Sequence, residues 1–270
     1  MKFCDITSFY MNRGGGVRTY HRSKLKYFAT KPEHEYILLA GGTKNGMEIV
    51  PGGRIYYVRG FPVGWNGSYR QIGDIREVRR IIAHEQPDII ESGSPWADGW
   101  ITLYGRGNTG AKTVGFYHAD VPDSYIAPAV EGLPKILGRT AVRFWRFYTW
   151  LSYNQFDATV VTSKYIENKL SGMGLHTTQR IPLGVDTELF TPKKRCERMR
   201  RELGAAPGDD LLLFAGRFRK EKGIETLVRA IRALDGRPKT KFVLVGDGPH
   251  ASHVRDLSLI HISEPTRLRR

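Results

Sequence analysis

Three consecutive glycines, Gly14, Gly15 and Gly16, stand near the start of the chain, between a strand-like run and a stretch with helical spacing. Glycine lets the backbone approach a ligand closely, and the first turn of a helix offers unpaired amide groups to a phosphate. The loop therefore predicts an anion-binding site. Glycines at such a turn can also serve the chain reversal alone, so this motif needs support from other residues.

A histidine, His118, and an aspartate, Asp120, directly follow a predicted strand at Lys112 to Tyr117. Open α/β sheets place their ligands at the carboxyl ends of their strands. A histidine at this edge can hydrogen-bond a sugar hydroxyl or stabilise a developing charge. A single histidine is more often structural, so this assignment also depends on the other motifs.

Two cations, Arg217 and Lys222, lie in the run GRFRKEKG that separates a predicted strand from a predicted helix. Fixed cations together with helix-end amides can stabilise the negative charge that builds on a leaving diphosphate, without a metal. The sequence contains no Asp-x-Asp pair of the kind that holds a divalent ion. We therefore predict cationic stabilisation and no metal site. In isolation, the run could also be a solvated charged loop.

The segments around these motifs alternate between short β-rich apolar runs and helix-length amphipathic stretches, a pattern typical of parallel sheets with crossover helices. The predicted strands of the first region are Lys2–Ile6, Tyr36–Ala40, Arg54–Arg59, Asp88–Glu91, Lys112–Tyr117 and Ala158–Thr162. The predicted helices are Val17–Ala29, Tyr69–His84, Arg139–Asn154 and Lys164–Ser171. Residues 1–180 therefore predict a doubly wound, Rossmann-like α/β domain.

A hinge is predicted at residues 181–192, where Pro182, Gly184 and Pro192 interrupt regular structure. A second β/α series follows in residues 193–256. Its predicted elements are a basic helix at Arg195–Leu203, a strand at Leu211–Ala215, a helix at Ile224–Leu234 and a strand at Lys241–Val245. Two strands cannot cover the apolar faces of such a sheet, so we expect this second domain to be incomplete.

The last residues, 257–270, lose the helical register and end in a basic string. The part from Leu257 to Arg267 resembles the conceptual translation of a transposase adapter used in sequencing. We therefore expect residues 257–270 to be a non-native tail.

Composition and charge indicate a folded protein with an anionic partner. The chain has 270 residues, of which 40% are hydrophobic and 26% charged, as in ordinary globular proteins. Its net charge of +15 favours nucleic acid, a phosphorylated substrate or an acidic membrane face. Cys4 and Cys196 have no metal-ligand spacing and predict no disulfide framework. Without a signal peptide or an apolar run of about 20 residues, the sequence predicts a cytoplasmic protein.

An aromatic and basic helix at 139–154, RTAVRFWRFYTWLSYN, has two interpretations. It could lie on a membrane surface through its aromatic side chains. Alternatively, the aromatic residues belong to the core and only one edge of the helix is basic. We favour the second interpretation and keep an anionic membrane surface as a candidate partner.

Taken together, these motifs resemble family 4 glycosyltransferases, which are retaining enzymes of the GT-B fold with two Rossmann-like domains. The resemblance covers residues 1–256. It rests on the glycine loop, the strand-end His118, the hinge motif LGVD at 183–186, the run at 216–223 and the turn with Gly246 and Gly248. The opening DITSFYMNRGGGVRTY and the segment YHADVPDSY are similar to bacterial mannosyl- or glucosyltransferases of the family.

The resemblance implies a role for each matching residue. Arg217 and Lys222 would bind the donor diphosphate, Gly15 and Gly16 would contact phosphate or acceptor, and His118 would touch the transferred sugar. The other residues implied to line the cleft are Gly14, Asp120, Gly246 and Gly248.

The implied reaction moves a hexose from a GDP- or UDP-linked sugar to a hydroxyl of a glycan or lipid-linked acceptor, with retained configuration and without a cofactor or metal. The inner membrane face is a further location implied for the enzyme. Family members carry a Glu-x7-Glu motif further along the second domain, and nothing here fills that place. The resemblance therefore implies that these 270 residues bind donor poorly and are inactive.

Two other functions remain open. A nucleotide-dependent oxidoreductase or epimerase needs a third glycine where Thr19 stands and an acidic residue after the second strand, where Leu38, Leu39 and Ala40 stand. A basic nucleic-acid-binding protein would suit the net charge, but no helix-turn-helix, zinc or RNA-recognition motif supports it.

Overall fold

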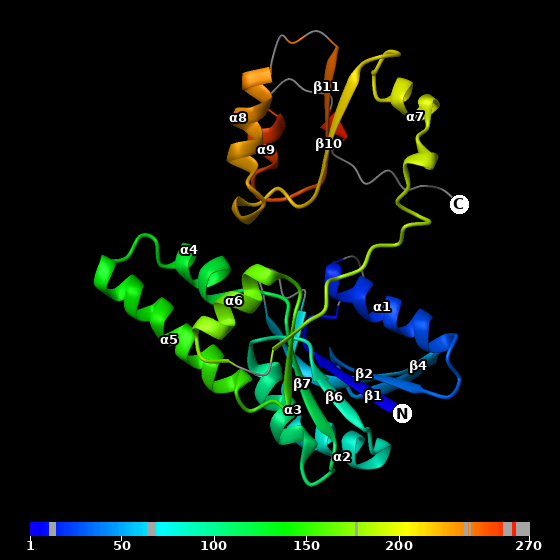
Figure 1. Ribbon diagram of the computed structural model, residues 1–270, viewed down its shortest axis with the longest axis vertical. Helices are drawn as coiled ribbons and strands as arrows, with labels where there is room; N and C mark the ends of the chain where they lie inside the picture. Colours follow the sequence, from blue (N-terminus) through cyan, green and yellow to red (C-terminus); the bar gives the residue numbers. More distant parts are fainter. Residues whose placement is uncertain are drawn as a thin grey trace. The chain divides into compact units, whose positions relative to one another are not determined.

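The computed structural model describes residues 1–10, 15–63, 69–175, 178–234, 237, 239–255 and 261–262, with only the backbone described at 221, 253, 255, 261 and 262. The chain divides into two compact units, Met1–Leu183 and Gly184–Arg270. The boundary lies inside residues 181–192. Each unit has its own sheet (Figure 1).

The first unit is built on a nine-stranded sheet with β1 near its centre. The strands run in the order β3 (Gly46–Val50), β4 (Gly53–Val63), β2 (Glu35–Gly42), β1 (Lys2–Thr7), β6 (Ile89–Ser92), β7 (Lys112–Tyr117), β8 (Ala158–Val161) and β9 (Thr178–Arg180), and β5 (Tyr69–Ile72) pairs with β4. All pairings are parallel except those of β4 with β3 and with β5. The predicted α/β fold with a parallel sheet is confirmed.

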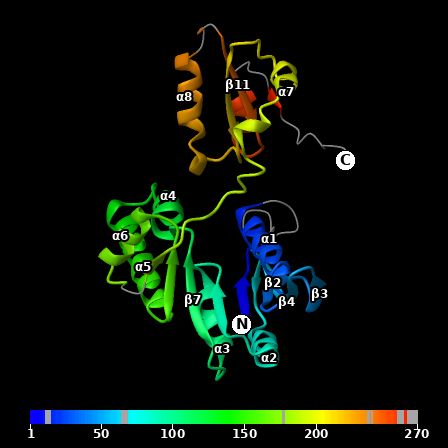
Figure 2. The same cartoon turned by 45° about the vertical axis from the view of Figure 1, so that its right-hand side comes forward.

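Helices cover both faces of this sheet, because successive side chains of a strand point to opposite faces. The helices are α1 (Gly16–Ala29), α2 (Ile75–Glu85), α3 (Ala97–Arg106), the short α4 (Ala127–Ala129), α5 (Lys135–Tyr153) and α6 (Lys164–Gly172), and a π-helical turn at Pro122–Ile126 precedes α4. In β2, Tyr36 and Leu38 pack in the cluster that contains Phe28 of α1. Ile37 and Leu39 pack in the cluster that contains Ile81 of α2. Figure 2 shows α4, α5 and α6 together at the β7 side of the sheet and α1 at the β2 side.

The prediction of a helix at Tyr69–His84 was wrong for its first residues. Residues Tyr69–Ile72 form β5, which pairs antiparallel with β4, and α2 begins only at Ile75. Asp74 caps this helix by accepting a hydrogen bond from the backbone nitrogen of Glu77, at 3.1 Å. β3 and α3 were not predicted either. Both β3 and β5 are short strands that pair with β4, and local spacing does not reveal such a pairing.

The second unit contains α7 (Glu197–Glu202), β10 (Asp210–Ala215), α8 (Ile224–Leu234), β11 (Thr240–Val245), α9 (Ala251–Arg255) and β12 (His261–Ile262). The strands form a parallel sheet in the order β10-β11-β12. Only two strands were expected in this unit. That expectation was wrong, because the short β12 adds a third strand. Its core cluster consists of Phe218, Ile224, Val228, Ile231, Leu244 and Val254. On β10, Leu213 remains 64% exposed.

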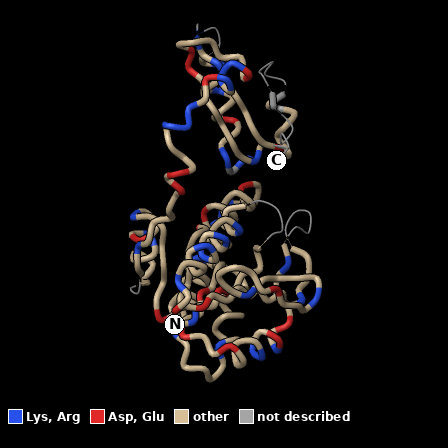
Figure 3. The backbone as a smooth tube through the Cα atoms, turned by 90° about the vertical axis from the view of Figure 1, so that its right-hand side faces the viewer, with Lys and Arg blue, Asp and Glu red and all other residues tan. Residues whose placement is uncertain are grey.

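None of the helices in the described residues combines the length and apolar character needed to cross a bilayer. Lys and Arg are spread over both units (Figure 3).

Candidate functional site

The first candidate region lies at the carboxyl ends of β1 and β6. From β1 the chain proceeds to β2 on one side, while β6 pairs with β1 on the other side, so the strand order changes direction here. Open α/β sheets bind ligands at this kind of switch point. The loop after β1 leads into α1, so the topology puts the glycine run at this edge.

The glycine loop is described from Gly15 onward, and Gly14 lies outside the described residues. Gly15 is the residue before α1 and has φ of 89°, a conformation that favours glycine. Its carbonyl accepts a hydrogen bond from the backbone nitrogen of Thr19, at 3.2 Å. Gly15 and Gly16 are exposed, and among the described residues no atom beyond their chain neighbours and the helix backbone lies within 4 Å of where a Cβ would stand on either. The described part of the loop therefore leaves room for a ligand at the start of α1.

A buried polar network holds α1 against the sheet. Nζ of Lys24 donates to Oδ2 of Asp5 at 2.8 Å and to Oε2 of Glu91 at 2.9 Å. The hydroxyl of Tyr20 donates to Oε1 of Glu91 at 2.9 Å. Asp5 and Glu91 are direct partners in the register of β1 and β6. One lysine therefore bridges two neighbouring strands and fixes the helix that carries the glycine loop.

The carboxylates of this network have opposite pKa shifts. Burial alone would raise the pKa of Asp5, but the Lys24 ammonium and the His21 ring lower it to about 2. Burial and the charge of Asp5 raise the pKa of Glu91 to about 7, against the effect of Lys24. Two carboxyl groups share one ammonium, so the second keeps its proton more readily. His21 and Tyr36 complete the network, with the hydroxyl of Tyr36 donating to Oδ2 of Asp5 at 2.7 Å.

A second network fixes the end of β1. The backbone nitrogen of Ser8 donates to Oδ2 of Asp98 at 2.9 Å, and the Ser8 hydroxyl donates to the other oxygen of this carboxylate. The side-chain amide of Gln71 donates to the Ser8 hydroxyl at 2.9 Å. Asp98 is fully buried, and burial raises the pKa of its carboxyl. The chain entering the glycine loop is therefore held by α3 and β5.

His118 stands at the end of β7 and belongs to the same region as α1. Its ring lies 5.3 Å from that of Phe116, which lies 5.0 Å from the ring of Tyr20 on α1. Nδ1 of His118 is buried and has no hydrogen-bond partner among the described residues. Burial lowers the pKa of His118. Burial therefore favours the neutral form of the ring.

Asp120 is held in an ion-pair cluster instead of standing alone at the sheet edge. Its carboxylate accepts hydrogen bonds from the Tyr117 hydroxyl, at 3.0 Å, and from Nζ of Lys169 on α6. Lys169 also pairs with Asp123, which Arg146 of α5 contacts at 3.1 Å. These contacts give Asp120 a structural role. Its contact with substrate stays a prediction.

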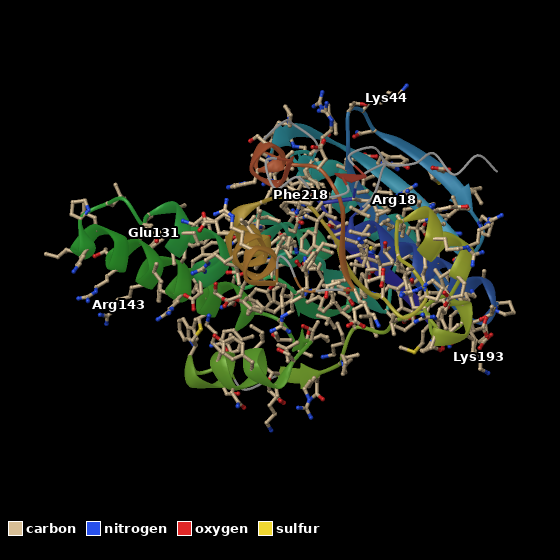
Figure 4. The ribbon with its side chains drawn as sticks, turned by 90° about the horizontal axis from the view of Figure 1, so that it is seen from above. Arg18, Lys44, Glu131, Arg143, Lys193 and Phe218 are labelled. Atoms are coloured by element: carbon tan, nitrogen blue, oxygen red, sulfur yellow. The ribbon has the colours of Figure 1, made fainter. Side chains whose placement is uncertain are left out.

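The second candidate region is the loop between β10 and α8. Arg217 and Lys222 are both exposed, and neither forms an ion pair within the part of the chain that the structure describes. Between them, Phe218 is 4% exposed and packs into the core of the unit (Figure 4). A buried aromatic side chain thus anchors the loop, and the cations beside it remain available to an anion.

The loop after β11 supports this cationic loop through its backbone. The nitrogen of Gly216 donates to the carbonyl of Val245 at 2.9 Å, and the nitrogen of Phe218 donates to that of Asp247 at 2.9 Å. A Cβ on Gly246 would stand 1.8 Å from the carbonyl oxygen of Gly216, and one on Gly248 would stand 2.5 Å from that of Phe218. These two glycines allow the close approach of the loops. Their predicted contact with a ligand is untested.

Four functional residues were not predicted from the sequence: Asp5, Lys24, Glu91 and Asp98. The available signal was an acidic residue inside an apolar strand, as in KFCDIT and DIIES. A buried carboxylate needs a cationic or hydrogen-bonding partner, and only the fold shows which residue supplies it. Within the described residues, no group of three or more His, Cys, Asp and Glu could hold a metal ion. That no metal is needed stays a prediction.

Comparisons with known proteins agree with this architecture. The family model described as Glycosyltransferase Family 4 matches residues 14–189, more than half of the chain. The model described as Glycosyl transferases group 1 matches residues 196–262.

Among curated proteins, the chain is 28% identical over 252 residues to a GDP-mannose-dependent alpha-(1-6)-phosphatidylinositol dimannoside mannosyltransferase of Mycobacterium tuberculosis, covering 92% of this chain and 63% of the relative. It is 24% identical over 239 residues to a GDP-mannose-dependent alpha-mannosyltransferase of Corynebacterium glutamicum, covering 83% of this chain and 52% of the relative. The chain thus spans less than two thirds of the length of each of these relatives.

Solved structures share the fold. A sucrose-phosphate synthase from Thermosynechococcus elongatus superposes with a TM-score of 0.71 at 17% identity, covering 97% of this chain and 70% of that chain. HepE from Anabaena, in complex with UDP-glucose, gives a TM-score of 0.64 at 16% identity, covering 96% and 64%. With a family model that matches more than half of its residues, the chain belongs to glycosyltransferase family 4.

Proposed function

We propose that this protein is a retaining hexosyltransferase that moves mannose or glucose from a nucleotide-diphospho sugar to a hydroxyl of a glycan or a lipid-linked acceptor. The observation that carries the proposal is the loop after β10, which presents two exposed cations beside the buried anchor Phe218. The relatives in Mycobacterium and Corynebacterium are named as GDP-mannose-dependent, and HepE was solved with UDP-glucose. GDP and UDP donors are therefore the two candidates.

Arg217 and Lys222 would act on the leaving group. As the bond between the sugar C1 and the diphosphate oxygen breaks, negative charge builds on the diphosphate. A guanidinium, an ammonium and the free amides at the start of α8, which begins at Ile224, favour this charge. They can do so without a metal ion.

In the first unit, the exposed Gly15 and Gly16 at the start of α1 would bind a phosphate or the acceptor, and the partly exposed ring of His118 would contact the transferred sugar. The acceptor oxygen forms a new bond to C1 on the face that the diphosphate leaves. Because attack and departure use the same face of C1, the configuration is retained. A phosphate oxygen takes the acceptor proton, so the charges balance. Exclusion of water from the site would limit hydrolysis of the donor.

The proposal is tested by equilibrium titration of the 270-residue chain with GDP, UDP and the unphosphorylated nucleosides. We expect binding that depends on the diphosphate and that falls by about tenfold or more in Arg217→Gln and in Lys222→Gln. Arg232→Gln changes an exposed cation in the last turn of α8 and serves as the matched control. Equal affinities in all four proteins would rule out this loop as the donor diphosphate site.

We further propose that the 270 residues alone bind donor weakly and do not turn it over, because the second unit contains no Glu-x7-Glu pair. Incubation with radiolabelled GDP-mannose or UDP-glucose and a lipid extract measures the turnover directly. Turnover above the rate of a heat-treated sample would contradict it. The titration and this assay have separate readouts, so either statement can fail without the other.

A further inference from the structure

Helix α5 exposes an apolar surface that its own unit does not cover. The buried side of the helix is formed near its C-terminal end by Thr149, Ser152 and Tyr153. On the opposite side stand large apolar side chains that are between 56% and 79% exposed, which we call the α5 apolar row: Ile136, Leu137, Phe144 and Phe147. Soluble proteins rarely leave so many large apolar groups together in water unless the surface binds something.

The spacing of these residues places them on one face. At about 100° per residue, Ile136, Phe144 and Phe147 fall within a sector of less than a third of the helix circumference. The rings of Phe147 and Trp150 stack with centroids 5.8 Å apart, which extends the row toward the C-terminal end. From Ile136 to Phe147 the row is about 17 Å long at the rise of an α-helix.

A basic row runs directly beside the apolar row. Lys135, Arg139, Arg143 and Arg146 follow one another at spacings of four, four and three residues, and three of them directly precede Ile136, Phe144 and Phe147 of the apolar row. All four are exposed, and Figure 4 shows the side chain of Arg143 pointing outward from α5. Arg146 pairs with Asp123. The other three form no ion pair with any residue that the structure describes.

The apolar row and the basic row match the two layers of an anionic bilayer, its acyl chains and its charged headgroups. Aromatic and aliphatic side chains enter the boundary between headgroups and acyl chains, while adjacent cations contact the lipid phosphates. Long Lys and Arg side chains can reach the headgroups while their stems lie along apolar surface. An uncharged protein partner that covered the apolar row would not need a basic row beside it. The charge therefore favours a lipid surface over a neutral protein partner.

We propose that α5 docks the first unit on an anionic lipid bilayer, with the α5 apolar row inserted into the interface and the basic row against the headgroups. The proposal deepens the proposed function by naming the surface at which a lipid-linked acceptor would be met. It does not depend on glycosyl transfer, because docking can be measured without donor or acceptor.

The experiment is co-sedimentation of the 270-residue chain with vesicles. One set contains equal parts of phosphatidylglycerol and phosphatidylcholine, and the other contains phosphatidylcholine alone. We expect binding to the anionic vesicles that weakens as salt is raised, and about tenfold weaker binding to the neutral ones. The double variant Phe144→Ser/Phe147→Ser should lose binding by about tenfold or more. The double variant Arg139→Gln/Arg143→Gln should lose most of the salt dependence.

Ile49→Ser is the matched control, since Ile49 is 76% exposed on β3 of the same unit but lies outside α5. It should bind vesicles like the unchanged chain. All changed residues are exposed, so thermal melts should coincide and a loss of binding cannot come from unfolding.

The proposal is overturned if the unchanged chain does not sediment with anionic vesicles, or if the Phe144 and Phe147 changes leave binding intact. It is also overturned if size-exclusion chromatography shows self-association that the same changes abolish while vesicle binding is absent. In that case a second copy of the chain covers the row. None of these outcomes bears on the nucleotide titration of Arg217 and Lys222.

Discussion

Nζ of Lys24 lies 2.8 Å from Oδ2 of Asp5, and this contact joins the third turn of α1 to the middle of β1. The same ammonium lies 2.9 Å from Glu91 on β6. The helix that begins with the glycine loop is therefore fixed to the two strands between which the sheet changes direction. Several measurable consequences depend on this contact and on the loops around it.

Replacing Lys24 by methionine should strongly destabilise the first unit. The change leaves Asp5 and Glu91 buried next to each other without their shared cation, which typically costs about 3–5 kcal/mol. Urea unfolding measures the loss. Lys26→Met, on the exposed side of the same helix, is the control and should change stability by less than about 0.5 kcal/mol. If both variants unfold at the same urea concentration, the network does not stabilise α1.

Glu91 should make stability decrease as pH rises from about 4.5 to about 7. Its pKa in the folded protein is raised to about 7 from the ordinary value of 4.5, so the folded state holds a proton in this range that the unfolded chain has lost. Glu91→Gln should remove this slope, which amounts to about 3 kcal/mol across the range. Thermal melts at several pH values provide the measurement. If stability still falls with pH in Glu91→Gln, Glu91 is not the group responsible. A variant of another acidic residue that removes the slope would then identify that residue as the cause.

Replacing His118 by leucine should separate function from stability. The buried Nδ1 has no partner among the described residues, and such a group costs about 1–3 kcal/mol when left unpaired. His118→Leu should therefore melt at the same or a higher temperature. The affinity for GDP-mannose or UDP-glucose relative to that for GDP or UDP should fall by about tenfold, because the contact with the sugar is lost. A variant that melts lower and keeps this affinity ratio would show that His118 is only structural.

Adding a methyl group at Gly246 should disrupt the donor loop without touching a charged residue. The new Cβ would stand 1.8 Å from the carbonyl oxygen of Gly216, so the loops after β10 and β11 must separate. We expect Gly246→Ala to weaken GDP or UDP binding and to lower the melting temperature of the second unit. Gly184→Ala is the control, because apart from its chain neighbours no atom of the described residues lies within 4 Å of its added Cβ. Unchanged affinity in Gly246→Ala would show that the loop contact does not position the cations.

Asp120→Asn should act on stability alone. The change weakens the ion pair with Lys169, whose side chain is only 15% exposed, and a hydrogen bond to a charged group contributes about 1.5–3 kcal/mol. Chemical unfolding should show this loss, while nucleotide titration should give the affinity of the unchanged chain. A loss of affinity at unchanged stability would instead support the role in the cleft that the family resemblance implies for this residue.

The sequence by itself determined the fold class and most of the elements. The helix at Ile224–Leu234 and the strand at Lys112–Tyr117 were predicted with the bounds that the structure shows. The signal for these segments is local: the apolar periodicity and the flanking turn residues can be recognised within a short window of the sequence. The glycine run, the strand-end His118 and the two cations of GRFRKEKG were readable for the same reason, although their roles in binding remain predictions.

Only the tertiary structure decided which polar residues support these motifs and which helix face stays exposed. Asp5 and Glu91 are 86 positions apart in the chain, yet the pairing of β1 with β6 makes them neighbours that one lysine can bridge. The aromatic residues of α5 were expected mainly in the core, whereas Phe144 and Phe147 are 60% and 56% exposed. Spacing along a helix shows that residues share a face. Whether that face is covered depends on segments distant in sequence, and their packing is set by the whole fold.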